Sequence, residues 1–207
     1  KLKRPRMAAI LDPIKLVITN YPEGEGELVD VPNNQENEEM GTRQVPFSRE
    51  LYIEREDFKI EKPKKYRRLY VGNEVRLMNA YFVTCTGYDV DDDGNVTCVY
   101  ATYDPESRGG NSPDGRKVRG TIHWVSAKTA KKAEIRLYNE DGSINVNPNS
   151  LTVIKEAYVE PELEKYDKGD SFQFMRTGYF CLDSKDSTKE HMVFNRIVSL
   201  KSSYKPN

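Results

Sequence analysis

The chain has few of the residues that build metal sites and hydrolytic active sites. Its 207 residues include two histidines, His123 and His191, and three cysteines, none of them in a Cys-x-x-Cys pair. A structural zinc site therefore has too few ligands. The sequence also contains no Gly-x-Ser-x-Gly nucleophile motif, no Walker-type phosphate loop and no Gly-x-Gly-x-x-Gly that opens a helix. These absences predict a chain with no catalytic residues and no metal site of its own.

Long apolar segments are lacking as well. No run of 18 apolar residues occurs, and no apolar stretch follows the basic start as it would in a signal peptide. The odd number of cysteines, three, argues against a disulfide framework. We therefore expect a cytoplasmic protein with no membrane partner. Because the chain begins Lys-Leu-Lys-Arg without methionine, we also expect it to be part of a longer protein.

The net charge of −1 conceals a separation of charge along the chain. The segment Glu23–Glu39 holds seven acids and no lysine or arginine, whereas Lys62–Arg76 holds six bases and one acid. Further bases gather at the N-terminus, in Arg116–Arg119 and in Lys128–Lys132. Separated charge of this kind is typical of a protein that presents one face to a polyanion. A plain solvated surface is the alternative interpretation.

Apolar and polar residues alternate with a period of two over much of the chain, which predicts β-strands. The clearest strands are Val75–Val83, Val96–Tyr103 and Arg116–Val125, the last with His123 on its polar, surface-exposed face. We expect further strands at 14–19, 51–53, 133–138, 151–154, 172–175, 179–182 and 193–200. About ten short strands at regular spacing favour a β-barrel or a sandwich.

The link between the first two of these strands is acidic. Asp89–Gly94 mimics the first half of a calcium loop, but the twelfth position, where such a loop needs glutamate, is Tyr100. We therefore expect a hairpin turn at Asp93-Gly94 and no metal. That turn places Cys85 opposite Thr102, so a disulfide to Cys98 is not expected.

A basic cluster follows at Lys62–Arg68, where five bases occur within seven residues and Tyr66 lies among them. Cations can bind phosphates and base edges, and a flat ring can stack on a base. The cluster therefore predicts contacts to single-stranded nucleic acid.

A specific resemblance rests on five segments: Ala8–Tyr21, Met40–Ser48, Glu54–Phe58, Asp114–Ser126 and Gly178–Asp183. In this order, and over nearly the whole chain, they resemble the C-terminal anticodon-binding region of glutaminyl-tRNA synthetase. The glutamyl-tRNA synthetases of archaeal and eukaryotic type share the architecture and are an alternative. Met40–Ser48 and the His-Trp-Val-Ser segment are similar to the glutaminyl branch.

The resemblance implies a mainly β fold of two β-barrels packed side by side, with the distal barrel inserted into the proximal one. We expect residues 1–61 and 143–207 to form the proximal barrel and residues 62–142 the distal barrel. The basic run at 62–68 and the Asn/Gly/Pro-rich stretch 139–150 mark the expected crossovers.

The resemblance also implies a partner and a reaction. The region would bind the anticodon stem-loop of a glutamine tRNA and support ATP-dependent charging of that tRNA by the protein's own upstream catalytic domain, a class I ligase that binds ATP and Mg²⁺. The signatures of that domain do not occur in this chain. We expect a monomer, and we expect this region by itself to bind tRNA weakly and to catalyse nothing.

Carried over residue by residue, the resemblance assigns contacts to the anticodon bases. Arg6 and Gln173 match the positions that contact the middle base, a uridine. Arg68 matches the arginine that recognises guanine at the third base, where a guanidinium can bind the O6/N7 edge bidentately. Arg176 matches a neighbouring basic contact. Gln173 and Arg176 have opposite strand parity, so a bulge or the Thr177-Gly178 turn must bring them together.

The first anticodon base is where the sequence departs from the family. Arg76 matches one of two positions near this wobble base, and Met78 stands where the second is commonly arginine. Alternation puts both on one strand face, so the predicted pocket has lost a cation. Arg67 matches a further basic contact, and Lys65 stands where the family often has glutamine.

Two interpretations from other classes stay open. A β-barrel that binds structured RNA in the ribosome, as the 5S-RNA-binding ribosomal barrel protein does, would carry similar basic patches. A protein-interaction barrel is the other. Binding that depends on the anticodon is expected only for the synthetase region.

Overall fold

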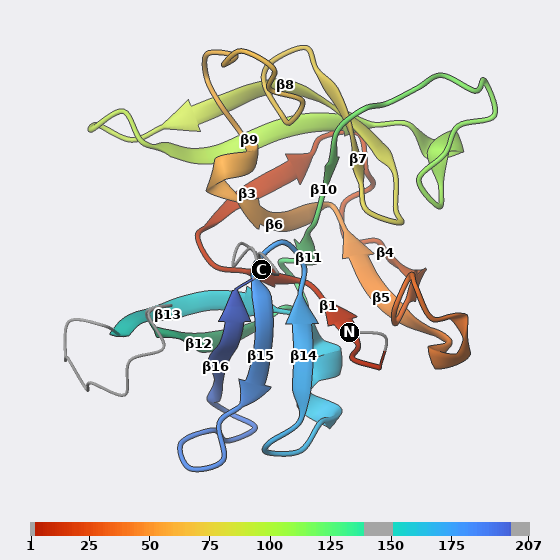
Figure 1. The fold of residues 1–207 in the computed structure, drawn as a ribbon. Helices are drawn as coiled ribbons and strands as arrows, with labels where there is room; N and C mark the ends of the chain where they lie inside the picture. The colour runs from red at the N-terminus through yellow and green to blue at the C-terminus, as the bar shows by residue number, and fades with distance from the viewer. Residues whose placement is uncertain (1–2, 139–150, 200–207) are drawn as a thin grey trace, which may run out of the picture. The chain divides into compact units, whose positions relative to one another are not determined.

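The structure is a computed structural model that describes residues 3–138 and 151–199 (Figure 1). Over these ranges the regular structure consists of β-strands and short 3-10 helices, with no α-helix, so the predicted mainly β class is confirmed. No helix in the described ranges is long and apolar enough to cross a membrane. The strands are β1 (Arg6–Met7), β2 (Ala9–Ile10), β3 (Pro13–Ile18), β4 (Gly26–Pro32), β5 (Thr42–Ser48), β6 (Glu50–Glu54), β7 (Glu74–Leu77), β8 (Phe82–Val90), β9 (Val96–Tyr103), β10 (Thr121–Ile122), β11 (Val125–Ser126), β12 (Lys131–Tyr138), β13 (Leu151–Val159), β14 (Ser171–Phe174), β15 (Gly178–Leu182) and β16 (Met192–Ser199). The 3-10 helices are η1 (Glu38–Met40), η2 (Arg55–Asp57), η3 (Pro105–Ser107) and η5 (Pro161–Lys165).

The chain divides into two compact units. Unit 1 comprises Lys1–Leu11, Pro32–Thr42 and Lys131–Asn207, and unit 2 comprises Asp12–Val31 and Arg43–Ala130. The expected barrels, 1–61 with 143–207 and 62–142, have different boundaries. The difference arises because β3 pairs with β9 and β6 pairs with β3 and β11, which joins two N-terminal segments to the middle of the chain. The expected crossover at 139–150 lies outside the described residues.

Unit 1 is built on a seven-stranded sheet in the order β1-β14-β15-β16-β12-β13-β2. Phe172 and Phe174 of β14 are fully buried, whereas Gln173 between them is only half-buried. The ring of Phe174 lies 4.6 Å from that of Phe180 and 5.1 Å from that of Phe194, between centroids. The period of two therefore gives one side of β14 to an aromatic core and leaves Gln173 on the other side.

Unit 2 contains a second seven-stranded sheet, β10-β7-β8-β9-β3-β6-β11, while β4 and β5 form a separate two-stranded sheet. Its core includes Phe47, whose ring centroid lies 5.2 to 5.3 Å from those of Tyr21, Tyr81 and Trp124. The hydroxyl of Tyr81 donates a hydrogen bond to Glu27. Burial first, and this hydrogen bond second, raise the pKa of Tyr81, so its phenol stays neutral.

The expected strand Val75–Val83 is instead a hairpin, and that prediction is wrong. β7 ends at Leu77, and the chain reverses into β8 through Asn79, whose φ of 62° is left-handed. The amide of Leu77 donates to the Tyr81 carbonyl at 2.8 Å, which closes the turn. Met78 therefore lies in the turn and does not share a strand face with Arg76, as alternation had suggested.

The expected strand Arg116–Val125 is also wrong over most of its length, because only Thr121–Ile122 and Val125–Ser126 are paired. The amide of Arg76 donates to the Gly120 carbonyl at 2.8 Å, and residues before Gly120 follow an irregular path. His123, expected at the surface, is 3% exposed, and its Nε2 lies 4.0 Å from Glu54 Oε1.

The β8–β9 hairpin is confirmed, but its register differs from the expected one. Cys85 pairs with Ala101, not with Thr102, since irregularities occur between Cys85 and Gly87 and between Asp89 and Val90. In the turn, the carboxylate of Asp91 accepts hydrogen bonds from the amides of Asp93 and Asn95, at 3.0 and 2.9 Å. These local bonds account for the acidic repeat as turn chemistry.

Candidate nucleic-acid interface

The basic cluster of unit 2 lines an open cavity of about 780 Å³. Lysines, arginines and two tyrosines dominate its wall, and Glu74 is the one acid among the residues that line it. The lining residues are Lys62, Lys65, Tyr66, Arg67, Tyr70, Asn73, Glu74, Lys117, Val118, Arg119 and Gly120. Cations and rings on one concave surface are the combination that single-stranded nucleic acid requires.

The cavity is built on irregular backbone fastened to the sheet of unit 2. The amide of Leu69 donates to the Asp57 carbonyl at 2.8 Å, and the amide of Lys59 donates to the Leu69 carbonyl at 3.0 Å. Between them the chain loops out, with Lys65 at a left-handed φ of 58°. The ring of Tyr66 lies 6.4 Å from that of Tyr70. The loop therefore carries its basic and aromatic side chains on a base that is held by the hydrogen bonds of Lys59 and Leu69.

Gly120 allows the two walls of the cavity to meet. A Cβ atom at this position would lie 1.9 Å from the carbonyl oxygen of Arg67, a distance that no side chain tolerates. Because the obstructing atom belongs to the backbone, it cannot rotate away. Glycine at position 120 is thus what lets the segment with Lys117 and Arg119 approach Arg67.

Arg68, predicted to recognise the third base, is held by a buried carboxylate. Its Nη1 lies 3.1 Å from Oδ1 of Asp57, which is fully buried, while the Arg68 side chain is 40% exposed. Its own carbonyl accepts a hydrogen bond from Asn73 Nδ2 at 2.7 Å. A carboxylate on one side orients the guanidinium and leaves other N–H groups for a ligand. This contact between Asp57 and Arg68 could not be predicted from the sequence.

Two other arginines of unit 2 are engaged by the fold itself. Arg76 donates from Nε to the Gly110 carbonyl at 2.5 Å and from Nη1 to Thr121 Oγ1 at 3.1 Å. Arg116 binds Glu74 through both Nε and Nη2, at 2.8 and 3.0 Å. The hydrogen bonds with Glu74, then Asp104 and Asp114, raise the pKa of Arg116. Arg116 therefore stabilises the fold and adds little to a polyanion-binding face.

Met78 keeps its place through backbone contacts. Its amide donates to the Ile122 carbonyl at 3.0 Å, and its carbonyl accepts from Trp124 Nε1 at 3.0 Å. The side chain is half-buried. Arg76 and Met78, the two residues predicted to lie near the wobble base, therefore come from the end of β7 and from the turn that follows it.

Unit 1 brings together the two residues predicted to contact the middle base. Arg6 of β1 and Gln173 of β14 are direct partners in a parallel ladder, and Arg6 Nε donates to Gln173 Oε1 at 3.2 Å. Arg6 Nη1 donates to Gln35 Oε1 at 3.0 Å, and its Nη2 lies 2.8 Å from Glu36 Oε2. The contacts of Gln35 and Glu36 with Arg6 could not be predicted from the sequence, because an acidic segment such as Glu23–Glu39 is also typical of a solvated surface.

Arg176 lies at the end of the same hairpin as Gln173. It occupies the loop between β14 and β15 with a left-handed φ of 64°, and its side chain is exposed. The amide of Thr177 donates to the Phe174 carbonyl at 3.0 Å. A turn, and not a bulge, therefore follows Gln173.

Aromatic and cationic groups extend this surface of unit 1. The guanidinium carbon of Arg4 lies 5.0 Å from the centroid of Tyr179, and Tyr179 pairs with Gln173 across the β14–β15 ladder. Neither Arg4 nor Tyr179 could be assigned to a site from the sequence. Their register beside Gln173 is visible only once the strands are paired.

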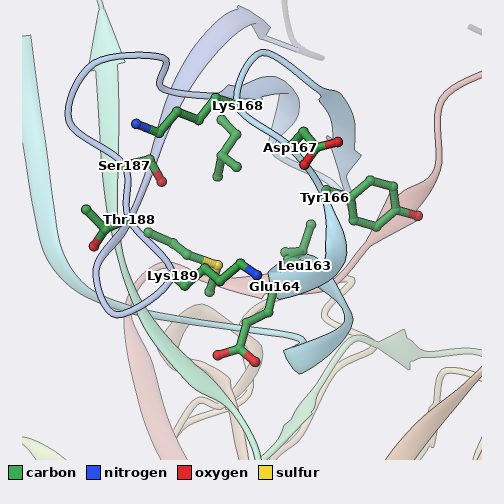
Figure 2. Close-up of a pocket in the computed structure, with 10 residues that line it drawn as sticks. Leu163, Glu164, Tyr166, Asp167, Lys168, Ser187, Thr188 and Lys189 are labelled. Atoms are coloured by element: carbon green, nitrogen blue, oxygen red, sulfur yellow. The ribbon is translucent and has the colours of Figure 1, made fainter.

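A smaller pocket of about 150 Å³ lies elsewhere in unit 1 (Figure 2). Leu163, Leu182 and Met192 contribute apolar side chains to its lining, and Lys168 and Lys189 contribute basic ones. None of the predicted base contacts lines it. Within the described residues, no group of three or more His, Cys, Asp or Glu side chains could hold a metal ion.

Comparison with known families identifies the two halves of the chain. A model described as "tRNA synthetases class I (E and Q), anti-codon binding domain" matches residues 5–104, and a second model with the same description matches residues 121–183. Together they include every residue predicted to contact an anticodon base.

Curated relatives agree with these matches. The glutamine–tRNA ligase of Clostridium kluyveri is 55% identical over 97% of this chain, and those of Vibrio vulnificus and Clostridium perfringens are 51% and 50% identical over 97%. This chain spans 38% of the length of each of these relatives. The chain therefore belongs to the anticodon-binding domains of the class I tRNA synthetases for glutamate and glutamine, and within them to the glutaminyl type.

Proposed function

We propose that this chain recognises the anticodon of glutamine tRNA with separate sites on its two units. In unit 1, Arg6 and Gln173 bind the middle base, and Arg176 binds the adjoining backbone. In unit 2, Arg68 binds the third base, and Arg76 and Met78 contact the first.

The observation that carries this proposal is the Arg6–Gln173 pair. Two residues 167 positions apart in the chain are strand partners, with a hydrogen bond of 3.2 Å between their side chains. Arginine and glutamine together offer the donors that the keto oxygens of uracil accept. A second observation, the basic and aromatic cavity, supports the phosphate contacts by Lys65 and Arg67.

The proposal extends to the protein of which this region is a part. We place it among the glutamine–tRNA ligases, with a catalytic domain outside this chain that binds ATP and Mg²⁺ and charges the tRNA. We further propose that it acts as a monomer in the cytoplasm. In that protein the present region supplies recognition and no reacting group.

Filter binding with glutamine tRNA, and with tRNAs changed one anticodon base at a time, tests the proposal. We expect weaker binding for changes at the middle and third bases, and little effect when cytidine and uridine are exchanged at the first base. We also expect a steep salt dependence, with a slope of about 0.7 per phosphate contact on a single strand. Equal affinity for all anticodons would favour a barrel that binds structured RNA, such as a ribosomal one. A flat salt response would contradict nucleic-acid binding altogether.

Arg68 provides the sharpest single position for this test. Arg68→Ala should cost about 1–3 kcal/mol for tRNA with guanine at the third anticodon position, and much less for tRNA with adenine there. Comparing the two RNAs on one variant cancels any loss of stability caused by exposing Asp57. Equal losses for both RNAs would make Arg68 a phosphate contact.

A further inference from the structure

The acidic segment that follows β4 is anchored beside β1 in unit 1. The amide of Arg6 donates to the Asn33 carbonyl at 2.7 Å, and Asn34 Nδ2 donates to the Arg4 carbonyl at 3.1 Å. The amide of Asn33 in turn donates to the Gly41 carbonyl at 3.0 Å. These hydrogen bonds give the side chains of the segment a defined position next to Arg6.

The guanidinium of Arg6 meets acceptors on three of its nitrogens. Gln173, Gln35 and Glu36 accept from Nε, Nη1 and Nη2. Since a guanidinium carries five N–H groups and no acceptor, one N–H on each Nη is left. The Arg6 side chain is only 16% exposed, so the plane of the remaining donors is set by these partners.

The same geometry assigns the amide of Gln173. Arginine can only donate, so the atom of Gln173 that faces Arg6 must be its oxygen, and the NH₂ group points elsewhere as a donor. Glu36 differs from Arg6 and Gln173, which both have hydrogen-bond donors, because an ionised carboxylate can only accept hydrogen bonds. Its side chain is 59% exposed, so an oxygen remains accessible to a ligand.

We infer that Glu36 is a specificity-determining residue for the middle anticodon base, an inference that rests on the function proposed above. Uracil presents an acceptor, a donor and an acceptor along its Watson–Crick edge: O2, N3–H and O4. The Gln173 amide donates to one keto oxygen, Arg6 donates to the other, and Glu36 accepts from N3–H. Cytosine reverses two of these groups, since its N3 accepts and its N4 donates. The acid therefore repels cytosine where it binds uracil.

The ion pair with Arg6 does not by itself explain why an acidic residue stands at position 36. A pair with one partner so exposed contributes little to stability in water. As an acceptor for a base, however, a carboxylate makes a charge-assisted hydrogen bond, which is about twice as strong as a neutral one. Glu36 also balances the charge of Arg6, which reduces the attraction of Arg6 for a phosphate and leaves its donors for the base.

Glu36→Gln tests this role with little change in shape. The probes are two synthetic RNA hairpins with the glutamine anticodon loop, one with uridine and one with cytidine at the middle position. We expect the wild-type chain to bind the uridine hairpin more tightly than the cytidine hairpin. In the variant, the ratio of the two affinities should be about tenfold smaller. The amide of glutamine can turn to donate to N3 of cytosine, so part of the loss should come from tighter cytidine binding.

Glu38→Gln is the matched control. It removes the same charge from the same segment, is exposed, and is not among the described partners of Arg6. We expect it to leave the ratio of the two affinities unchanged. If Glu36→Gln changes both affinities by one common factor, Glu36 acts only through charge and the inference is overturned. If the wild-type chain does not distinguish the hairpins, the proposed function itself fails.

Discussion

The two units place their candidate tRNA contacts on different kinds of backbone. In unit 1, Arg6 and Gln173 lie opposite each other in a strand ladder, and register alone makes them neighbours. In unit 2, Lys65 and Arg67 lie in a loop that meets a second irregular segment at Gly120. The geometry of the site in unit 1 therefore depends on the pairing of the whole sheet. The geometry of the site in unit 2 depends on the close approach of two segments at Gly120.

The chemistry of the two sites differs in the same way. Arg6 has its charge matched by Glu36 and its donors oriented by three acceptors, which suits discrimination between bases. Five lysine or arginine side chains and one acidic side chain line the cavity of unit 2, and this excess of positive charge favours binding of phosphates. Specificity at the middle base should therefore depend on hydrogen-bond geometry, and affinity in unit 2 should depend on charge and salt.

Gly120→Ala should produce the largest effect and should separate the two sites. The added Cβ meets the Arg67 carbonyl at 1.9 Å, so the cavity wall must shift, at a cost of about 3 kcal/mol in the free energy of unfolding. Affinity for guanine at the third base should fall, while the preference for uridine at the middle base should persist. Urea titration and filter binding measure the two effects.

Gly87→Ala is the control for this substitution. Gly87 lies in β8 of the same unit, and an added Cβ there meets no atom within 4 Å. The free energy of unfolding of the Gly87→Ala variant should stay close to that of the wild-type chain. If Gly120→Ala weakens discrimination at both bases equally, the sites are not independent and the contrast between the units fails.

Asp183→Asn addresses unit 1 through the pH dependence of stability. Asp183 accepts hydrogen bonds from Asn195 Nδ2 at 2.5 Å and from the amides of Asp186 and Lys185 at 2.7 and 2.8 Å. Led by the Asn195 contact, and with Arg136 nearby, these interactions lower the pKa of Asp183 from 3.8 to about 2. Because the folded pKa is depressed, the stabilisation is complete above pH 4 and is lost as the pH falls towards 2.

The expected size of that stabilisation is about 2 kcal/mol. Asp183→Asn should lower the free energy of unfolding by this amount at pH 7 and flatten its decline between pH 4 and pH 2. Salt dependence of RNA binding, which we attribute to unit 2, should not change. An unaltered acid profile would show that other carboxylates determine the acid stability.

Met78→Arg should have the smallest effect. A cation restored beside the first base, with its side chain half exposed, should tighten binding by about 0.2–1 kcal/mol, without altering preference at the third base. We also expect the wild-type chain to separate cytidine from uridine poorly at the first position, since a thioether offers only flexible apolar contact. Binding assays with tRNAs that differ at this base measure both.

Lys65 is the reference for this last substitution. If Met78→Arg tightens binding only when Lys65 is also replaced, Lys65 already fills the first-base pocket, and the idea that this pocket lost a contact is wrong. A double-mutant cycle gives the answer directly.

Alternation predicted the strands well where pairing is regular. Val96–Tyr103 matches β9, and the aromatic positions 172, 174 and 180 are core residues, because a period of two separates the faces of any strand. It failed at Val75–Val83, where Asn79 reverses the chain, and at Arg116–Val125, where the segment before Gly120 is irregular. Apolar alternation cannot reveal a turn whose residues also face a core.

By itself the sequence determined the predominance of strands and the location of the basic clusters, since these follow from local periodicity and composition. Only the tertiary structure decided which cations remain for a ligand. Arg116 is engaged by Glu74, while Lys65 and Arg67 line an open cavity. Charged groups are satisfied by partners far away in the chain, and such partners become known only when the strands pair.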